Sequence, residues 1–505
     1  MADSSKDRNL GLFTTRWGMM LAMLGMAVGT GNIWRFPRVV ANNGGGSFLI
    51  AWACFLLLWS VPLIMIEFTM GKHARQGPIG AFMKVAGRKL AWMGAWVAWT
   101  ATAIMFYYAV VMAWTLRYTW AAVIGEIPTA QPGALWDTFS YSWAVLPVHA
   151  ISMALGVWVV ARGVRGIEAA SRVLMPTLIL MVVVLAIRAV TLPGASAGLN
   201  FMFTPNWEQL ADYRTWLEAL TQNAWDTGAG WGLIVAYAIY MRKGEDTALN
   251  AFMLGFGNNS VSLMAGIMVL CTVFSIMPDA AAEITGAGNE GLTFIWVPQL
   301  FDLMPLGRFF MFLFFLALLF AAWTSLVSMI ELAVRVLADL GMTRRRAVAL
   351  VGTVGFLLGV PSALSADVFA NQDWVWGVGL MVSGLFYAIA VLRFGVRRFR
   401  ETLINTPDAD IRVGAWWDWA VRFVVVQAAV LVIWWLYTEG GVRQMLAGDF
   451  GAAFSPYGVL NTLIQWGAAI VFFLIANDWM ARRTEAHGGT HPELGAPPAD
   501  PGAIP

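Results

Sequence analysis

The sequence places glycines and a polar side chain together in the middle of a long apolar segment, at residues 24–37 (LGMAVGTGNIWRFP). Three glycines, Gly25, Gly29 and Gly31, fall within seven residues, and Asn32 follows them directly. Backbone groups that a helix break frees inside a membrane must line a polar cavity or bind a ligand. The stretch therefore predicts an interrupted helix whose freed backbone takes part in binding.

A second apolar segment repeats this pattern at residues 223–232 (NAWDTGAGWG), where Gly228, Gly230 and Gly232 follow Asp226. Freed carbonyls and a carboxylate attract cations, whereas the amino-terminal ends of half-helices attract anions. The two stretches together predict a site within the membrane that can bind a cation and an anionic group.

Small residues have another use in membrane helices, since Gly25-x-x-x-Gly29 also lets two helices pack closely. Close packing does not explain Asn32 or Asp226, because polar and ionisable side chains are costly within a span and are usually functional. We therefore favour broken helices at a binding site over simple packing.

The composition indicates a polytopic membrane protein, because 59% of the 505 residues are hydrophobic and only 12% are charged. A net charge of +2 without a basic stripe argues against a nucleic-acid partner. The sequence has no HExxH or GxSxG motif and no Cys/His cluster at metal-ligand spacing, so an enzyme is not expected. Cys54 and Cys271 lie in apolar runs, which predicts free, buried thiols.

Hydrophobicity predicts twelve membrane-spanning segments. Their approximate ranges are 16–41, 46–70, 92–123, 143–161, 167–188, 215–242, 247–277, 306–338, 346–363, 374–394, 417–437 and 458–478. Lys and Arg concentrate in alternate connections such as 71–91 and 395–416, whereas 124–142 and 278–305 contain neither. The positive-inside rule then places both termini in the cytoplasm, with the chain in the plasma (inner) membrane.

The membrane domain is expected at residues 15–480, after a cytoplasmic segment at 1–14. The tail at 481–505 is rich in Gly, Pro and Ala and is predicted to be disordered. Its two histidines, His487 and His491, are not expected to bind metal, because such sites usually need three or four ligands.

Spans 1 and 6 carry the two breaks, lie five spans apart and run in opposite directions. This spacing indicates an inverted repeat of five helices, with repeat 1 at about 15–190 and repeat 2 at about 210–395. Two final helices follow at about 417–478. The fold class is thus an all-α membrane protein with broken helices 1 and 6.

The residues resemble the neurotransmitter:sodium symporter family, whose prokaryotic members include the bacterial leucine transporter. The resemblance rests on residues 24–37, the NGGGSF motif at 43–48, Tyr107-Tyr108 and Thr324-Ser325, and it covers about residues 10–480. It implies the leucine transporter-type fold. Inverted repeats with broken helices are known from this same family, so the repeat and the resemblance are one observation.

The resemblance implies two sodium sites and no organic cofactor. The first site takes the Ala27 carbonyl and the side chains of Asn32, Asp226 and Asn258. The second takes the carbonyls of Gly25, Val28 and Ala321 and the hydroxyls of Thr324 and Ser325. Such oxygen ligands suit a hard cation. Taken alone, the adjacent Thr-Ser pair is more typical of hydroxyls bonded to their own helix.

Asp226 stands where the family usually has a small hydroxyl residue. Chloride-dependent members bind Cl⁻ nearby, and this sequence keeps Gln222 and Ser262 of that set but has Trp52 in place of a tyrosine. We therefore expect Asp226 to supply the negative charge that chloride supplies elsewhere. The alternative is an aspartate that burial keeps protonated.

The resemblance also implies a substrate site. It comprises Ala27, Gly29, Thr30, Gly31, Ile104, Tyr108, Trp225, Asp226, Gly228, Trp231, Ser325 and Met329. Monoamine transporters of the family have an aspartate at the position of Gly29, and glycine leaves room for a substrate carboxylate. The mostly apolar residues favour a neutral, hydrophobic amino acid, although Ile104 or Met329 alone could equally be ordinary packing.

Arg35 and Asp373 are implied as an extracellular gate above Tyr108 and Trp231, and Asp339 and Tyr240 as part of a cytoplasmic gate. At the cytoplasmic gate, Leu10 and Phe13 replace the arginine and tryptophan of the family, so Arg8 or Lys6 are candidate substitutes. Two further carboxylates, Glu67 and Glu331, lie within spans and are expected to bond to freed amides or neighbouring polar groups.

The sequence thus predicts a symporter that imports a neutral amino acid with sodium, as a monomer or homodimer in the lipid bilayer. One alternative is a sodium-dependent transporter of another solute or of an amine. Another is a nutrient sensor that binds without transporting.

Overall fold

The computed structural model describes residues 11–242, 244–407 and 409–488, and within these ranges the chain is built from helices joined by short loops. The predicted all-α class is confirmed in this part of the chain, where the only β contact is an isolated bridge between Gly45 and Pro205. Predictions about Lys6, Arg8, Leu10 and His491 fall outside the described residues.

Nine helical segments of the described chain are long and apolar enough to cross a membrane. They are α3–η3–α4 (Gly46–Ala74), η4–α6 (Arg88–Ile124), α9 (Gly163–Val190), α14 (Thr247–Ile276), α18 (Gly307–Asp339), α19 (Arg344–Leu364), α20 (Ala366–Phe394), α22 (Trp416–Thr438) and η8 with α24 (Gly451–His487; α24 itself Val459–His487). A shorter apolar helix, α8 (Val145–Val160), and two interrupted segments account for the other predicted spans. The count of twelve therefore stays a prediction.

The first predicted span is interrupted where the sequence pattern places the break. It consists of α1 (Arg16–Ala27), the π-helical turn η2 (Gly31–Arg35) and α2 (Phe36–Asn42). Thr15 caps α1 by accepting a hydrogen bond from the Gly18 amide at 2.9 Å. Val28 is extended, and the Asn32 side chain accepts the Gly29 amide at 2.8 Å. The asparagine thus satisfies a donor that the break releases.

The sixth predicted span is interrupted between α12 (Tyr213–Asp226) and α13 (Leu233–Ala238). Gly228, Gly230 and Gly232 have φ angles of 70°, 87° and 80°. Side chains with a Cβ are disfavoured at such angles. Alternate glycines therefore let the chain cross the membrane interior without continuing the helix.

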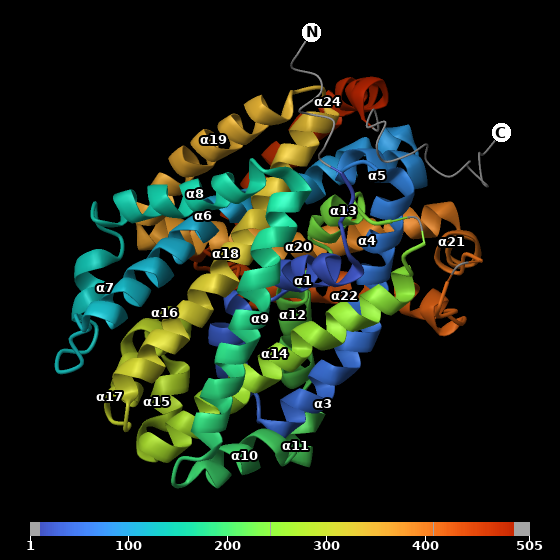
Figure 1. Cartoon of the computed structure of the whole chain (residues 1–505). Coiled ribbons are helices and arrows are strands. Elements are labelled where there is room, and N and C mark those ends of the chain that lie inside the picture. The colour runs from blue at the N-terminus through green and yellow to red at the C-terminus, as the bar shows by residue number, and fades with distance from the viewer. Residues whose placement is uncertain (1–10, 243, 408, 489–505) are drawn as a thin grey trace.

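The long helices form one bundle with short helices at its ends (Figure 1). Along the left and lower sides in that view lie α7 (Ala134–Phe139), α10 (Ala195–Phe203), α11 (Trp207–Ala211), α15 (Ala281–Gly286), α16 (Gly288–Glu290) and α17 (Val297–Asp302). The short helix α5 (Pro78–Ala86) and the last part of α24 lie at the opposite end. Within the bundle, α1 and α6 both pack against α18, which brings the first break close to Thr324 and Ser325.

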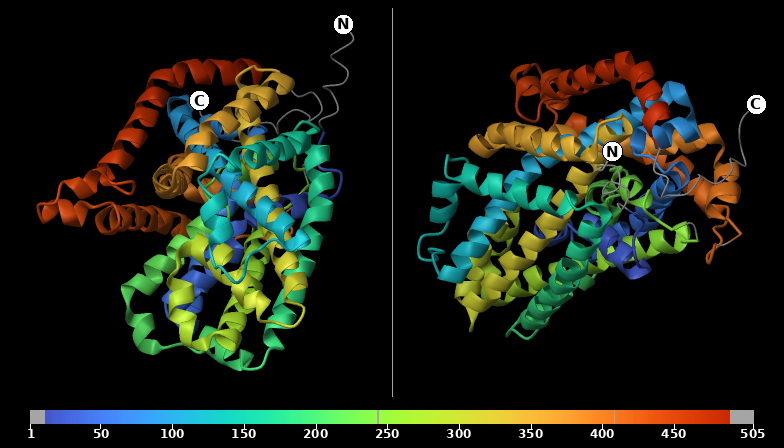
Figure 2. Two further views of the ribbon diagram at one scale, coloured as in Figure 1. Left: turned by 90° about the vertical axis from the view of Figure 1, so that its left-hand side faces the viewer. Right: turned by 45° about the horizontal axis from the view of Figure 1, so that its top comes forward.

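Helices α22 and α24 flank the bundle on one side (Figure 2). In the most apolar stretch of each segment, only 33% of the residues of α22 and 22% of those of the segment with α24 are buried, so most of these residues face outward. Helix α24 continues to His487, beyond the end expected at residue 480. The residues 481–487 (ARRTEAH) contain neither glycine nor proline, and Gly488 ends the helix. The predicted start of the disordered tail at 481 was therefore too early.

Candidate substrate and sodium sites

A cavity of about 240 Å³ lies between the two helix breaks. Every residue that the sequence assigned to the substrate site lines it, namely Ala27, Gly29, Thr30, Gly31, Ile104, Tyr108, Trp225, Asp226, Gly228, Trp231, Ser325 and Met329. These residues come from α1, η2, α6, α18 and the broken sixth span, so only the fold brings them together. Their individual roles stay predictions.

One end of the cavity places hydrogen-bonding groups around Gly29, which has no side chain. The Tyr108 hydroxyl accepts hydrogen bonds from the amide and hydroxyl of Thr30, at 3.2 and 3.3 Å, so it keeps its own proton to donate. A Cβ on Gly29 would lie 3.1 Å from Ser325 Oγ and 3.2 Å from Tyr108 Oη. Any side chain at position 29 would therefore occupy this end of the cavity.

Oxygen atoms converge beside the first break. Asn32 Nδ2 lies 3.1 Å from Asp226 Oδ2, 3.0 Å from Asn258 Oδ1 and 2.7 Å from Ser262 Oγ. The Ser262 hydroxyl also donates to Asp226 Oδ2 at 2.7 Å. All four side chains are buried. A carboxylate, an amide oxygen and a hydroxyl are ligands that suit a hard cation.

The orientation of Asn32 differs from its expected role as an oxygen ligand. Its amide nitrogen faces the oxygen cluster, while its Oδ1 accepts the Gly29 amide. The carboxylate of Asp226 explains this orientation, because an acceptor-only group favours N–H donors around it. A rotation of the Asn32 amide group by about half a turn exchanges Nδ2 and Oδ1, and it would turn the oxygen toward the cluster.

The residues assigned to the second sodium site meet where α1 ends against α18. A Cβ on Gly25 would lie 3.2 Å from Thr324 Cβ, so glycine permits this close approach. The Ser325 hydroxyl donates to the Met26 carbonyl at 3.4 Å and thereby links the two helices. The Thr324 hydroxyl donates to the Ala321 carbonyl of its own helix at 3.2 Å. This is the local bonding that the sequence analysis gave as the alternative to a sodium ligand.

The residues that resemble a chloride site are engaged elsewhere. Gln222 Oε1 accepts a hydrogen bond from Arg35 at 2.6 Å, and the Trp52 ring packs on Phe36 with ring centroids 4.7 Å apart. The remaining member of the set, Ser262, donates to Asp226. The carboxylate of Asp226 is thus the negative group that these contacts bring to the site.

The cavity continues past the expected extracellular gate to Arg38 and Glu290 near helix α16. Arg35 bonds to Gln222 and lies 5.6 Å from the centroid of the Trp225 ring. The described chain contains no ion pair between Arg35 and Asp373, although both line the cavity. The expected gate pair is therefore not formed in this structure, in which Arg35 is held by an amide and an aromatic ring.

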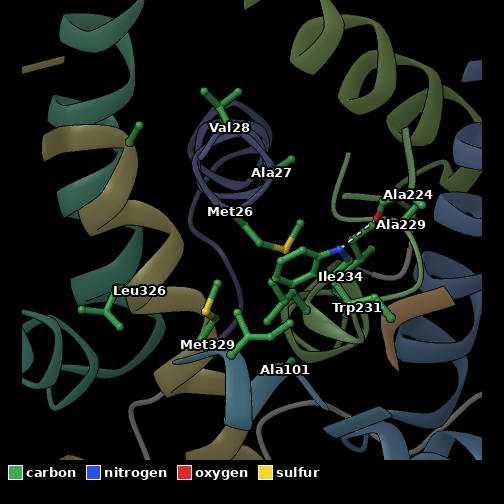
Figure 3. Packing of buried hydrophobic residues seen from close by; sticks show 14 of the residues in the cluster. Met26, Ala27, Val28, Ala101, Ala224, Ala229, Trp231, Ile234, Leu326 and Met329 are labelled. Carbon is green, nitrogen blue, oxygen red and sulfur yellow. Dashed lines mark hydrogen bonds between the residues drawn. The ribbon is translucent and has the colours of Figure 1, made fainter. Parts of the chain in front are cut away.

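Trp231 packs at the floor of this space, and Figure 3 shows its indole beside Met26. The indole nitrogen donates to the Ala224 carbonyl at 3.3 Å across the break. This bond gives a partner to one of the carbonyls that lie before the break.

The opposite end of the bundle is closed by buried ionic contacts. Tyr240 donates to Glu331 at 2.8 Å, and Arg344 pairs with Glu331 at 2.5 Å. Asp339 pairs with Arg335 one turn earlier on α18 and accepts the Gly77 amide at 2.6 Å. From the sequence, Arg8 or Lys6 were the candidates for the cation that pairs with Asp339 at this gate. The structure supplies Arg335 from the same helix, a partner that the i, i+4 spacing could have indicated.

The residues just before α1 are fastened to α9 and to the turn that follows α13 at this closed end. Phe13 donates its amide to the Tyr240 carbonyl at 3.1 Å, and its ring lies 6.3 Å from that of Tyr240. Glu168 accepts the amide and hydroxyl of Thr14 at 2.8 and 2.7 Å, and Arg172 pairs with it at 2.6 Å. Glu168 was not singled out from the sequence. Its i, i+4 spacing to Arg172, near the start of a predicted helix, is the signal that could have indicated the pair.

The expected role of Glu67 is confirmed, because its Oε1 accepts the amide of Gly230 within the second break at 2.6 Å. Glu331 likewise bonds to neighbouring polar groups, as expected. Both cysteines are free, but only Cys271 is fully buried, because Cys54 lies on a partly exposed face of α3. The described residues contain no group of three or more His, Cys, Asp or Glu side chains arranged to hold a metal.

Comparison with known proteins places these features in a family. The model of the sodium:neurotransmitter symporter family matches residues 11–145 and 138–476. An uncharacterized sodium-dependent transporter of Methanocaldococcus jannaschii is 28% identical over 475 residues, covering 90% of this chain and 94% of that protein. The uncharacterized sodium-dependent transporter YhdH of Bacillus subtilis is 30% identical over 442 residues, covering 83% of this chain and 96% of YhdH.

The crystal structure of MhsT in complex with L-phenylalanine has a similar fold. It superposes with a TM-score of 0.72 at 29% identity, covering 84% of this chain and 98% of MhsT. This agreement confirms the predicted leucine transporter-type fold. The chain is a multi-pass membrane protein that carries a small-molecule substrate with sodium, and it is not an enzyme. It belongs to the sodium:neurotransmitter symporter family.

Proposed function

We propose that this chain imports a neutral, hydrophobic amino acid together with sodium and without a requirement for chloride. The observation that carries the proposal is the absence of a side chain at Gly29, which lines the end of the cavity beside the Tyr108 hydroxyl and Ser325. A substrate carboxylate at this end would meet the Tyr108 proton and the amides at the start of η2, whose dipole favours an anion. An amine without a carboxylate would leave these donors without an acceptor.

The rest of the cavity supports an apolar substrate side chain. Ile104, Trp231 and Met329 line it. The indole ring of Trp231 and the thioether of Met329 offer apolar contact that adapts to the shape of a substrate. MhsT, whose structure this chain resembles, was crystallised with L-phenylalanine. A hydrophobic amino acid is therefore the substrate class that the cavity favours.

Two sodium ions are proposed to travel with the substrate. The first would be bound by Ala27, Asn32, Asp226 and Asn258, and the second by Gly25, Val28, Ala321, Thr324 and Ser325. The first set lies directly beside the cavity, so the substrate carboxylate can complete it. Sodium and substrate would then raise each other's affinity by the same factor.

Chloride independence is proposed from Asp226. Its carboxylate accepts hydrogen bonds from Asn32 and Ser262 within the oxygen cluster. A fixed anion beside the first sodium would balance the cation's charge, which is the role of chloride in chloride-dependent members. Asn32 and Ser262 both donate to this carboxylate, and donors of this kind support its ionised form.

Transport would follow from alternate opening of the two ends. The structure has an extended cavity on the side of Arg38 and buried ionic contacts on the side of Glu331. Binding would draw Arg35 and Asp373 together above the substrate, and release of the contacts at Glu331 and Asp339 would open the other end. We propose that this other end, with both termini, faces the cytoplasm across the plasma (inner) membrane.

Thermal unfolding of the purified protein tests the proposal. A panel of amino acids would be added in sodium gluconate, sodium chloride and choline chloride. We expect stabilisation by hydrophobic amino acids in both sodium salts and none in choline. Stabilisation only in sodium chloride would remove the role given to Asp226, and no stabilisation by any amino acid would favour another solute or an amine.

Uptake into vesicles separates a transporter from a sensor. If an amino acid stabilises the protein in sodium but never accumulates in vesicles, the chain is a sensor. Accumulation that requires an inward sodium gradient supports symport.

A further inference from the structure

A second cavity, of about 330 Å³, lies away from the substrate site between α6, α18, α19 and α24. Its lining is almost wholly apolar, and the one hydroxyl in it, of Thr102, donates to the Ala98 carbonyl at 2.7 Å. The symport mechanism uses none of its residues. Leu350 and Leu358 of α19 and Trp479 of α24 belong to its lining and are 43%, 48% and 56% exposed, so it opens toward the membrane.

This cavity occupies one leaflet of the membrane. It is lined by the first half of α6, the middle of α19 and the second half of α18 and α24. The lining parts of α6, α18 and α24 adjoin the arginine-rich end of the bundle, which we predict to be cytoplasmic, and that of α19 begins one turn after Arg346. Along α24 the lining runs from Phe472 to Met480, which is roughly 12 Å at the rise of an α-helix. Half of the hydrocarbon core is about 15 Å thick.

Arginines continue two of the apolar stripes that line the cavity. On α19, Leu350, Val354 and Leu358 recur every four residues, and Arg346 is the preceding member of that series. A side chain four residues earlier lies on the same helix face. The guanidinium of Arg346 is exposed, and no ion pair to it is found in the described chain.

Helix α24 repeats this arrangement. Ala476, Trp479 and Met480 line the cavity, and Arg483 follows Trp479 by four residues and Met480 by three. Arg483 is exposed and likewise lacks an ion pair within the described ranges. Trp479 is 56% exposed between the apolar stripe and the arginine. Tryptophans favour the level of the lipid headgroups.

We propose that the cavity binds an acyl chain of an anionic phospholipid, whose phosphate is held by Arg346 and Arg483. The apolar walls match the chain, the length matches one leaflet, and the two cations match the phosphate. A net-neutral phospholipid such as phosphatidylcholine offers a phosphate too, but its own cation lies beside that phosphate and competes with the arginines, whereas an anionic headgroup has no such cation. A second copy of the protein would have to cover both arginines with its own surface.

Native mass spectrometry of the delipidated protein tests this inference. Phosphatidylglycerol and phosphatidylcholine would be added separately, and the bound fraction measured for wild type and for two double variants. Arg346→Gln with Arg483→Gln removes the proposed phosphate ligands. Arg345→Gln with Arg482→Gln makes the same charge change at exposed neighbours that lie on other helix faces.

We expect wild type to retain phosphatidylglycerol in preference to phosphatidylcholine. Each of the two arginines should raise the affinity for phosphatidylglycerol about fivefold. The variant that lacks both should therefore bind this lipid about 25-fold more weakly. The control pair should bind like wild type. Ala476→Phe, which fills the cavity, should weaken the binding of both lipids.

If both double variants bind phosphatidylglycerol equally weakly, the loss of binding comes from the lower surface charge in general, and the proposal is overturned. Equal retention of the two lipids by wild type would also overturn it, as would a lipid-free dimer in which Ala476→Phe abolishes dimerisation. Gel filtration of each variant shows that it is folded. The result does not depend on which solute the protein transports.

Discussion

Replacing Gly29 with alanine tests the position of the substrate carboxylate. The added Cβ would lie 3.2 Å from Tyr108 Oη and 3.1 Å from Ser325 Oγ. A carboxylate oxygen bonded to Tyr108 must come within about 2.7 Å of the same hydroxyl. The methyl group and the carboxylate therefore compete for one space.

The expected loss of affinity follows from the bond that the methyl group blocks. A hydrogen bond to a charged group is worth about 1.5–3 kcal/mol. Its loss should weaken amino-acid binding by roughly 10- to 150-fold. Isothermal titration of the purified variant in sodium would measure the change. Sodium alone should still stabilise the variant, because the second proposed sodium site does not contain Gly29.

A matched control is Gly467→Ala on α24. A Cβ there meets no atom within 4 Å, and the residue lies outside the cavity. It should bind the amino acid like wild type. If Gly29→Ala also binds like wild type, the carboxylate does not lie at this end of the cavity and the assignment is refuted.

Substitutions at three further positions test other parts of the structure. Asp226→Ser should make transport depend on chloride, measured as uptake in chloride and in gluconate; equal uptake in both would reject the charge-replacement idea. Glu168→Gln should weaken the contacts to Thr14 and Arg172 and increase hydrogen–deuterium exchange in α1, whereas unchanged exchange would show that the contacts do not restrain the helix. Glu67→Ala leaves the Gly230 amide without a partner and should cost about 1–3 kcal/mol of thermal stability, while Glu67→Gln, which keeps an acceptor, should lose less.

The helix breaks could be predicted from the sequence because they depend on local chemistry. Glycines at 228, 230 and 232 adopt backbone angles that other residues avoid, and Asn32 and Asp226 are too polar for a helix that only crosses lipid. The lining of the cavity came from the family resemblance, because its residues lie on distant segments. Periodicity alone does not bring such segments together.

Side-chain orientation could not be predicted in the same way. The Asn32 amide nitrogen faces the oxygen cluster because several acceptors from different helices compete for it. Arg35 bonds to Gln222 because the cavity continues between the gate residues. The cation at Asp339 is Arg335, whose charge lies within an apolar helix. The orientations of Asn32 and Arg35 depend on tertiary neighbours that a single sequence does not reveal, whereas the i, i+4 spacing of Arg335 and Asp339 could have indicated their pairing.

Sodium-driven uptake tests the central claim most directly. The purified protein would be reconstituted into vesicles, and labelled L-phenylalanine would be supplied outside with an inward sodium gradient. We predict accumulation above the external concentration in sodium gluconate, and none when choline replaces sodium. Uptake that only equilibrates, or that is the same in choline, would contradict sodium symport of a hydrophobic amino acid.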